Sequence, residues 1–315
     1  MLLSRVAENL YWAARYLERA EDTARIVREH TNLIVDLPVS VPVTWQPLLA
    51  ITGTVEEFDE RERIVGEADI IHFLVAERDN TGSVVMCVEQ ARENLRTTRE
   101  VIPRDAWQAV NDLHLYVASH HLEGVERRSR NRFLDRVIAD SQRMVGILAG
   151  TMSRDEAYEM LRLGRHVERA DMTTRVIDVR AGMLMGERPD GIEHHDDVQW
   201  ASVLRSLSAL HMFHRAVRAP VSAPDALGFL LLDPAFPRSV THCLREIAAC
   251  VRRLPQEPHI LPSCDVALNR LGRLSVGQIT GASLHQLADE LQLYIAAIDT
   301  RISESWFHAD AGGEP

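Results

Sequence analysis

The sequence contains no lysine, and all 35 of its basic residues are arginine. Schiff-base catalysis, a lysine general base and a phosphate-binding P-loop each need a lysine ammonium group, so these chemistries are excluded. The Gly-x-Ser-x-Gly turn of serine hydrolases is absent, as are the Glu-x-x-His and His-Glu-x-x-His spacings of di-iron and zinc sites. The run at 194–197 (His-His-Asp-Asp) lies in a linker, where sequence neighbours rarely converge on one ion. We therefore expect no metal and no cofactor.

Cysteine and long apolar runs are also scarce. The four cysteines show no C-x-x-C spacing and are expected to be buried free thiols. No apolar run approaches the roughly 18 residues of a membrane span, and no cleavable signal is visible, which predicts a cytoplasmic protein. The net charge of -11 argues against nucleic-acid binding, because that needs a concentrated basic face.

What the sequence does have is helical periodicity. Apolar residues from Val6 to Val27 recur at spacings of three and four, with charges on the other faces, whereas strand-like alternation is almost absent. This predicts an all-α helical bundle of about 10–13 helices. Further stripes occur at 83–102, 104–119, 131–149, 154–185, 198–217, 238–254 and 283–307, and linkers rich in Pro, Gly or acidic residues fall at 36–44, 186–197, 218–225 and 255–265.

Some helix starts can be placed from their capping residues. Ser153 and Glu156 have the spacing of a capping box. Ser83 and Ser239 each precede an apolar stripe in the position of an N-cap. These residues predict helices that begin immediately after them.

The chain carries an internal repeat. Residues 15–25 match residues 165–175 at six of eleven positions, and two later blocks match at offsets of 155 and 156 in the same order. We interpret this as a duplication, with a first helical repeat at 1–150 and a second at 151–315. The two halves are expected to pack about a pseudo-two-fold axis as one compact unit.

The repeated block contains the candidate site. Glu18 and Glu168 both border the apolar stripe, where an unpaired charge would cost several kcal/mol. Two interpretations stay open: an internal Arg-Glu network that sets helix packing, or a site for a carboxylate ligand or an acidic partner segment. The outer pairs, Glu21 with Arg25 and Asp171 with Arg175, are expected to be surface salt bridges. The candidate ligand- or partner-binding residues are Arg15, Glu18, Arg19, Arg165, Glu168 and Arg169.

Several segments resemble the bacterial alpha-E family over essentially the whole chain. They are residues 3–12, 15–21, 91–94, 151–156, 163–173 and 229–240, whereas residues 76–83 depart from the family pattern. The resemblance implies that Glu18, Arg19, Glu168 and Arg169 are the motif residues, with Arg15 and Arg165 beside them. Family members are typically encoded beside, or fused to, a circularly permuted ATP-grasp protein, which implies a role in peptide tagging or amide ligation.

Three functional hypotheses follow. In the first, the chain is a non-ATP-binding partner or substrate-binding module of an ATP-grasp amidoligase encoded nearby, and holds an acidic peptide or a small carboxylate. In the second, it is an enzyme by itself, with Glu18 or Glu168 as general base and the paired arginine as carboxylate clamp. In the third, it is purely a structural or interaction protein. None involves nucleic acid or a membrane, and self-association is left open.

Overall fold

The computed structural model describes residues 2–38, 43–61, 65–181, 196–255 and 260–307, which form 14 α-helices and contain no strand. The all-α prediction is confirmed, and short helices such as α2 and α3 bring the number above the expected 10–13. The helices are α1 (Ser4–Asp36), α2 (Gln46–Thr52), α3 (Val55–Asp59), α4 (Glu67–Val75), α5 (Val84–Thr97), α6 (Arg104–Val125), α7 (Arg130–Thr151), α8 (Glu156–Val176), α10 (Asp196–Ser206), α11 (Leu210–Val217), α12 (Ala223–Leu232), α13 (Val240–Val251), α14 (Ile260–Gly272) and α15 (Gly281–Trp306). A π-helical turn, η1 (Ile177–Ala181), continues α8, and a 3-10 turn, η2 (Val276–Gln278), precedes α15.

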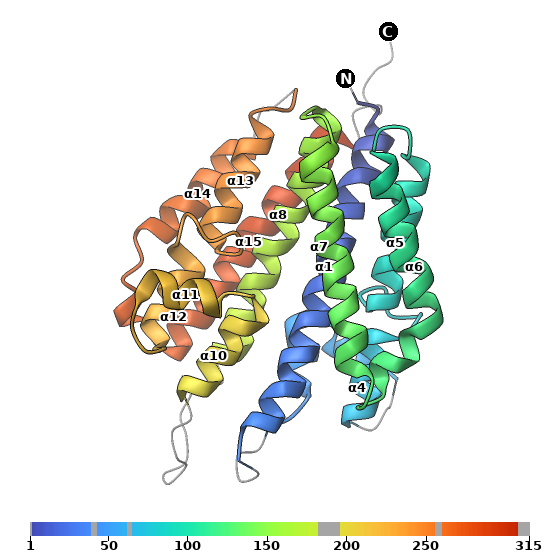
Figure 1. Cartoon of the computed structure of the whole chain (residues 1–315). Helices are drawn as coiled ribbons and strands as arrows, with labels where there is room; N and C mark the ends of the chain where they lie inside the picture. The colour runs from blue at the N-terminus through green and yellow to red at the C-terminus, as the bar shows by residue number, and fades with distance from the viewer. Residues whose placement is uncertain (1, 39–42, 62–64, 182–195, 256–259, 308–315) are drawn as a thin grey trace.

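The long helices pack in two matching circuits. In the first half α1 contacts α5, α5 contacts α6, α6 contacts α7, and α7 returns to α1. In the second half α8, α13, α14 and α15 contact one another in the same order. Figure 1 shows α1 and α8 together in the middle, with α5 and α6 on one side and α13 and α14 on the other. The origin of this likeness by duplication, and the boundary at 150, stay predictions.

The central helices α1 and α8 come very close to each other at one glycine. A Cβ atom on Gly164 would lie only 2.2 Å from the backbone oxygen of Tyr11. Any side chain at this position would therefore force the two backbones apart. The close approach brings the charged residues of both helices within reach of one another.

Two of the three predicted caps are confirmed. The hydroxyl of Ser83 accepts from the backbone N–H of Met86, and that of Ser239 accepts from the N–H of His242. The capping box at Ser153 is wrong, because α8 begins at Glu156 and Asp155 caps it. The carboxylate of Glu156 instead accepts from the backbone N–H of Leu2 at 2.6 Å.

Three other boundaries differ from the sequence prediction. The expected helix at 198–217 is interrupted, because Ser208 has a φ of 53° and separates α10 from α11. The expected linkers at 218–225 and 255–265 end early, since α12 begins at Ala223 and α14 at Ile260. Most of the linker expected at 186–197 lies outside the described residues, as do two of the four residues of the His-His-Asp-Asp run.

The four cysteines are buried and free, as predicted. None of the helices in the described ranges combines the length and the apolarity that crossing a bilayer requires.

Candidate functional site

The two Glu-Arg motifs lie opposite each other where α1 packs on α8, and each pairs with the other. Arg19 of α1 donates from Nε and Nη2 to the carboxylate of Glu168 at 2.5 and 3.0 Å. Arg169 of α8 donates in the same way to Glu18 at 2.8 and 2.9 Å. We call Glu18–Arg169 and Glu168–Arg19 the reciprocal pairs. Because each bond joins α1 to α8, the motif fixes the register of the central helices.

Each glutamate of the reciprocal pairs has a second arginine. Nε of Arg15 donates to Glu168 at 2.8 Å, and Nη2 of Arg238 lies 2.8 Å from Glu18. Both carboxylates are almost completely buried. Burial alone would raise the pKa of Glu18, but the guanidinium groups of Arg169 and Arg238 lower it to about 2. For Glu168 burial is likewise outweighed, and Arg19 and Arg15 lower its pKa.

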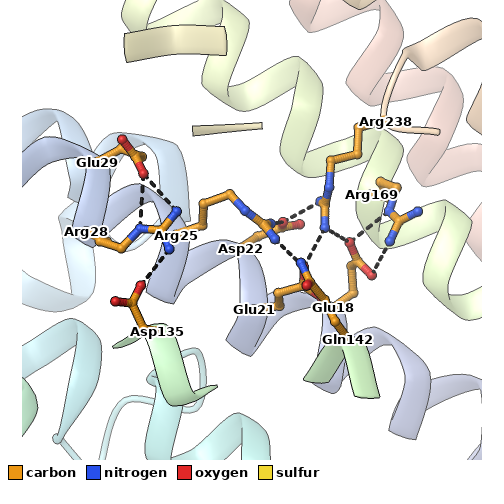
Figure 2. A network of polar contacts seen from close by, with 10 residues as sticks. All are labelled: Glu18, Glu21, Asp22, Arg25, Arg28, Glu29, Asp135, Gln142, Arg169 and Arg238. Atoms are coloured by element: carbon orange, nitrogen blue, oxygen red, sulfur yellow. Dashed lines mark hydrogen bonds and ion pairs between the residues drawn. The ribbon is translucent and has the colours of Figure 1, made fainter. Parts of the chain in front are cut away.

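Arg238, on the loop before α13, extends the Glu18 side into a larger network (Figure 2). Its guanidinium lies 2.5 Å from Asp22 and 3.0 Å from Glu21, in addition to Glu18. Arg25 is fully buried and also pairs with Glu21 and Asp22. The prediction that Glu21–Arg25 is a surface salt bridge is therefore wrong for the first copy.

The reason for this burial is that elements distant in the sequence cover the pair. Arg238 approaches from the loop before α13, and the side-chain amide of Gln142 on α7 donates to Glu21 at 3.1 Å. In the second copy Nε of Arg175 donates to Asp171 at 2.8 Å, and Arg175 stays about one-third exposed. The two outer pairs thus have different surroundings.

The structure brings five of the six predicted site residues into ion pairs. Arg15 contacts Glu168 and also lies 2.8 Å from Asp299 of α15. Arg165, the counterpart of Arg15, differs: its Nε is buried without a hydrogen-bond partner. Burial lowers the pKa of Arg165, the positive charge of Arg169 lowers it further, and the carboxylate of Glu18 acts in the opposite sense. The copies of the motif are therefore equivalent in their reciprocal pairs but not in the flanking arginine.

A cavity of about 190 Å³ lies beside Glu168, and we call it the Gly82 cavity. It is lined by α1, α8, the α2–α3 region and the loop before α5. Its residues are Arg19, Thr23, Thr52, Gly53, Thr54, Glu57, Asn80, Thr81, Gly82, Glu168, Asp171, Met172 and Arg175. The hydroxyl oxygen of Thr23 is buried there without a hydrogen-bond partner. A built, charged cavity with an unpartnered polar atom is the kind of place where a small polar group binds.

A second, more open cavity of about 510 Å³ lies between α8 and α15 and shares Asp171 and Arg175 with the first. Arg15 and Asp299 line it as well. A third, mostly apolar space near Glu18 and Arg165 has only about 30 Å³. Of the predicted site residues, Arg15, Arg19 and Glu168 thus border the larger cavities.

Sequence reasoning missed the contributions of Arg238, Thr23, Gly82 and Asp299. The sequence did contain a signal for Arg238: in the repeat, at an offset of 156, Arg238 stands where the first half has Gly82. Asp299 gave no comparable signal, because nothing in the pattern of α15 indicates that one of its acids reaches Arg15.

One group of side chains in the described part of the chain has the ligand types of a metal site. Asp178, His285 and Asp289 lie close together at the surface. However, Nδ1 of His285 lies 2.7 Å from Asp178 while Nε2 lies 3.7 Å from Asp289, so the two ring nitrogens face different carboxylates. The hydrogen bond that the ring of His285 donates to the carboxylate of Asp178 raises the pKa of His285. An imidazolium ion between two carboxylates accounts for this geometry without a metal.

Comparison with known proteins identifies the family. A family model called Alpha-E, described as a predicted alpha-helical domain with a conserved ER motif, matches residues 2–307. The chain belongs to the Alpha-E family. Uncharacterized proteins of Mycobacterium bovis and Mycobacterium tuberculosis are 23% identical to it over 276 residues, covering 80% of this chain. The matched region spans only 30% of the length of these relatives. No solved structure matches the chain significantly.

Proposed function

We propose that this Alpha-E protein is a binding module without catalysis of its own, which works beside an ATP-grasp-type amidoligase and holds the acceptor of the ligation. The observation that carries the proposal is the reciprocal pairing of Glu18 with Arg169 and of Glu168 with Arg19. The motif is used to join the two central helices, which gives the adjacent Gly82 cavity rigid walls. Such preorganisation favours binding, because little order is lost when the ligand enters.

The enzyme hypothesis is less well supported by the same geometry. A general base works best when its pKa lies near the operating pH. The pKa of Glu18 is lowered to about 2, and that of Glu168 is also lowered, so both carboxylates are weak bases at neutral pH. Their carboxylates are also buried and occupied by arginine.

The length of the relatives supports a modular role. In the mycobacterial proteins the matched region is 30% of the chain, so the helical unit is one part of a larger protein there. A unit that adjoins other domains in this way is suited to presenting a ligand to them. The ATP-grasp partner itself comes from the family resemblance and is the part of the proposal that needs direct test.

The test is reconstitution of the chain with the ATP-grasp-type protein encoded beside it. We expect the two to co-purify, and amide formation coupled to ADP release to rise at least tenfold when the chain is added. Arg175→Gln should weaken this stimulation, because Arg175 lines both of the larger cavities. Arg136→Gln is the control, since Arg136 also makes an i,i+4 pair, in the reverse order, with Asp140 on α7 and lines neither of these cavities.

Two results would contradict the proposal. One is a ligase whose rate is unchanged by the chain, and the other is turnover of an amide-forming reaction by the isolated chain. If both variants stimulate the ligase as strongly as wild type, the chain still acts with the ligase, but the ligand does not bind in these two cavities.

A further inference from the structure

The loops before α5 and α13 occupy equivalent positions, as three matched hydrogen bonds show. Ser83 and Ser239 donate from their hydroxyls to the carbonyls of Glu77 and Asp233. Their backbone N–H groups donate to the carbonyls of Asn80 and Phe236. The thiols of the cysteines four positions after the serines donate to Thr81 and Pro237. Gly82, just before Ser83, is therefore the structural counterpart of Arg238.

The two loops differ in what they place against the central helices. In the second half, Arg238 inserts its guanidinium between Glu18, Glu21 and Asp22 and is almost completely buried. In the first half, Gly82 has no side chain, and the space next to Glu168 and Asp171 is the Gly82 cavity. The cavity thus lies where the internal relationship of the halves would place a guanidinium group.

Glu168 is already held by Arg19 and Arg15, so the acids that could take another cation at the cavity are Asp171 and Glu57. Glu21 is paired with both Arg25 and Arg238, whereas among the described residues its counterpart Asp171 is paired with Arg175 alone. Burial raises the pKa of Asp171, Arg175 opposes this shift, and the nearby carboxylate of Glu168 adds to it. Met172 stands in place of Asp22, but Glu57 supplies another carboxylate at the cavity and makes no ion pair within the described residues.

Arg19 and Arg175 also line the cavity, and their charges oppose a cation. Their counterparts are Arg169 and Arg25, which lie on either side of Arg238. The fold therefore already accommodates a third guanidinium beside two others when acids lie between them. Thr23 also lines the cavity, and its hydroxyl is fully buried without a hydrogen-bond partner.

We propose that the Gly82 cavity binds a guanidinium or primary ammonium group at the end of a flexible chain, in the manner of Arg238 in the other half. The identity of the ligand rests on the proposed function. An amide-forming ligase consumes an amine, so the bound group would belong to the amine-bearing acceptor. The cation site itself is a property of the isolated chain and can be tested without the ligase.

The experiment measures binding of simple probes to the full chain by NMR titration at constant ionic strength. Methylguanidinium, n-butylammonium and acetate are the probes, and the first two separate an arginine-like from a lysine-like or small-amine source. We expect saturable binding of one or both cations, with shifts at Thr23, Gly82 and Asp171, and no saturable binding of acetate at this site.

Two substitutions should remove the site. Gly82→Arg is expected to fill the cavity from within and to weaken cation binding at least tenfold. No positive φ opposes a side chain here, but an added Cβ would lie 3.3 Å from the side-chain oxygen of Asn80, which must shift by a few tenths of an ångström. Asp171→Asn should weaken binding to a similar extent through loss of the carboxylate. Thermal melts of both variants establish that the fold is retained.

Two substitutions of neighbouring glutamates on α3 test whether the edge of the Gly82 cavity contributes to binding. Glu57→Gln should weaken cation binding about threefold, whereas Glu56→Gln should leave it unchanged, since both residues are exposed but only Glu57 lines the cavity. Tighter binding of acetate than of either cation would overturn the proposal, as would cation binding that survives Gly82→Arg in the folded protein. Cation binding without any stimulation of the ligase would uphold the site and contradict only the proposed function.

Discussion

Thr23 and Thr173 occupy equivalent places on α1 and α8, yet only one of their hydroxyls has a partner. Oγ1 of Thr173 donates to the backbone oxygen of Arg238 at 3.0 Å, whereas Oγ1 of Thr23 is buried without a partner. Replacing a buried unsatisfied hydroxyl by a methyl group of the same shape removes a desolvation penalty. Loss of the other hydroxyl leaves a carbonyl oxygen without its donor.

Thr23→Val should therefore raise the free energy of unfolding by about 1 kcal/mol, and Thr173→Val should lower it by about 1 kcal/mol. Urea denaturation followed by circular dichroism measures both. Equal destabilisation by the two substitutions would show that the hydroxyl of Thr23 has a partner in solution.

The carboxylate of Glu18 makes stability depend on pH. Its pKa falls from an ordinary value of 4.5 to about 2 in the folded chain, because Arg169 and Arg238 outweigh burial. Since the folded pKa is the lower one, the stabilisation is complete above about pH 4.5 and is lost as the pH falls towards 2. The size of this contribution is about 3 kcal/mol.

Glu18→Gln should unfold at lower denaturant concentration than wild type at pH 7. The difference in unfolding free energy should shrink by about 3 kcal/mol as the pH is lowered towards 2. Denaturation series at several pH values measure it. A difference that stays constant over this window would mean that the carboxylate is not held ionised by its arginine partners.

At the scale of elements, the contact between α1 and α8 depends on a glycine. Gly164→Ala should lower the free energy of unfolding by about 3 kcal/mol, because the new methyl group would overlap the backbone oxygen of Tyr11. A side chain could rotate out of the way, but the backbone of a packed helix cannot. Gly146→Ala on α7 is the control, since nothing lies within 4 Å of its added Cβ. There the higher helix propensity of alanine should stabilise the chain by about 1 kcal/mol. Thermal and urea melts of the two variants should move in opposite directions.

Elements were predicted well where local signals are strong. The stripes for α5, α6, α7, α13 and α15 and the caps at Ser83 and Ser239 follow from periodicity and from hydroxyl capping, which act over a few residues. The start of α8 was predicted wrongly because Asp155, itself a good capping residue, takes the N-cap position and accepts from the backbone N–H of Tyr158. The break at Ser208 likewise left no sign in the apolar pattern around it.

For the whole molecule, the buried network makes the two halves depend on each other. The carboxylates of Glu18, Glu21 and Asp22 in the first half are compensated by Arg238 and Arg169 of the second. Removing one partner of a buried ion pair costs about 3–5 kcal/mol, so separation of the halves would leave several such charges uncompensated. The halves should therefore unfold together.

Fluorescence can follow each half separately, with a variant that retains only Trp45 and another that retains only Trp200. Both should give the same urea midpoint, and it should coincide with the midpoint from circular dichroism. Two separated midpoints would show that the halves are independent domains, in conflict with their prediction as one compact unit.

By itself the sequence determined the helical class, most of the long helices and the repetition of the Glu-Arg motif, because apolar spacing and capping are local properties. It also placed Glu18 and Glu168 beside the apolar stripe, where they needed partners. Only the tertiary structure decided which arginine each one takes: Glu18 pairs with Arg169 and Glu168 with Arg19. The spacing of residues along one helix does not predict a contact with a residue about 150 positions away. Such a contact forms only when α1 and α8 pack together. The insertion of Arg238, and the cavity left at Gly82, depend on the same packing.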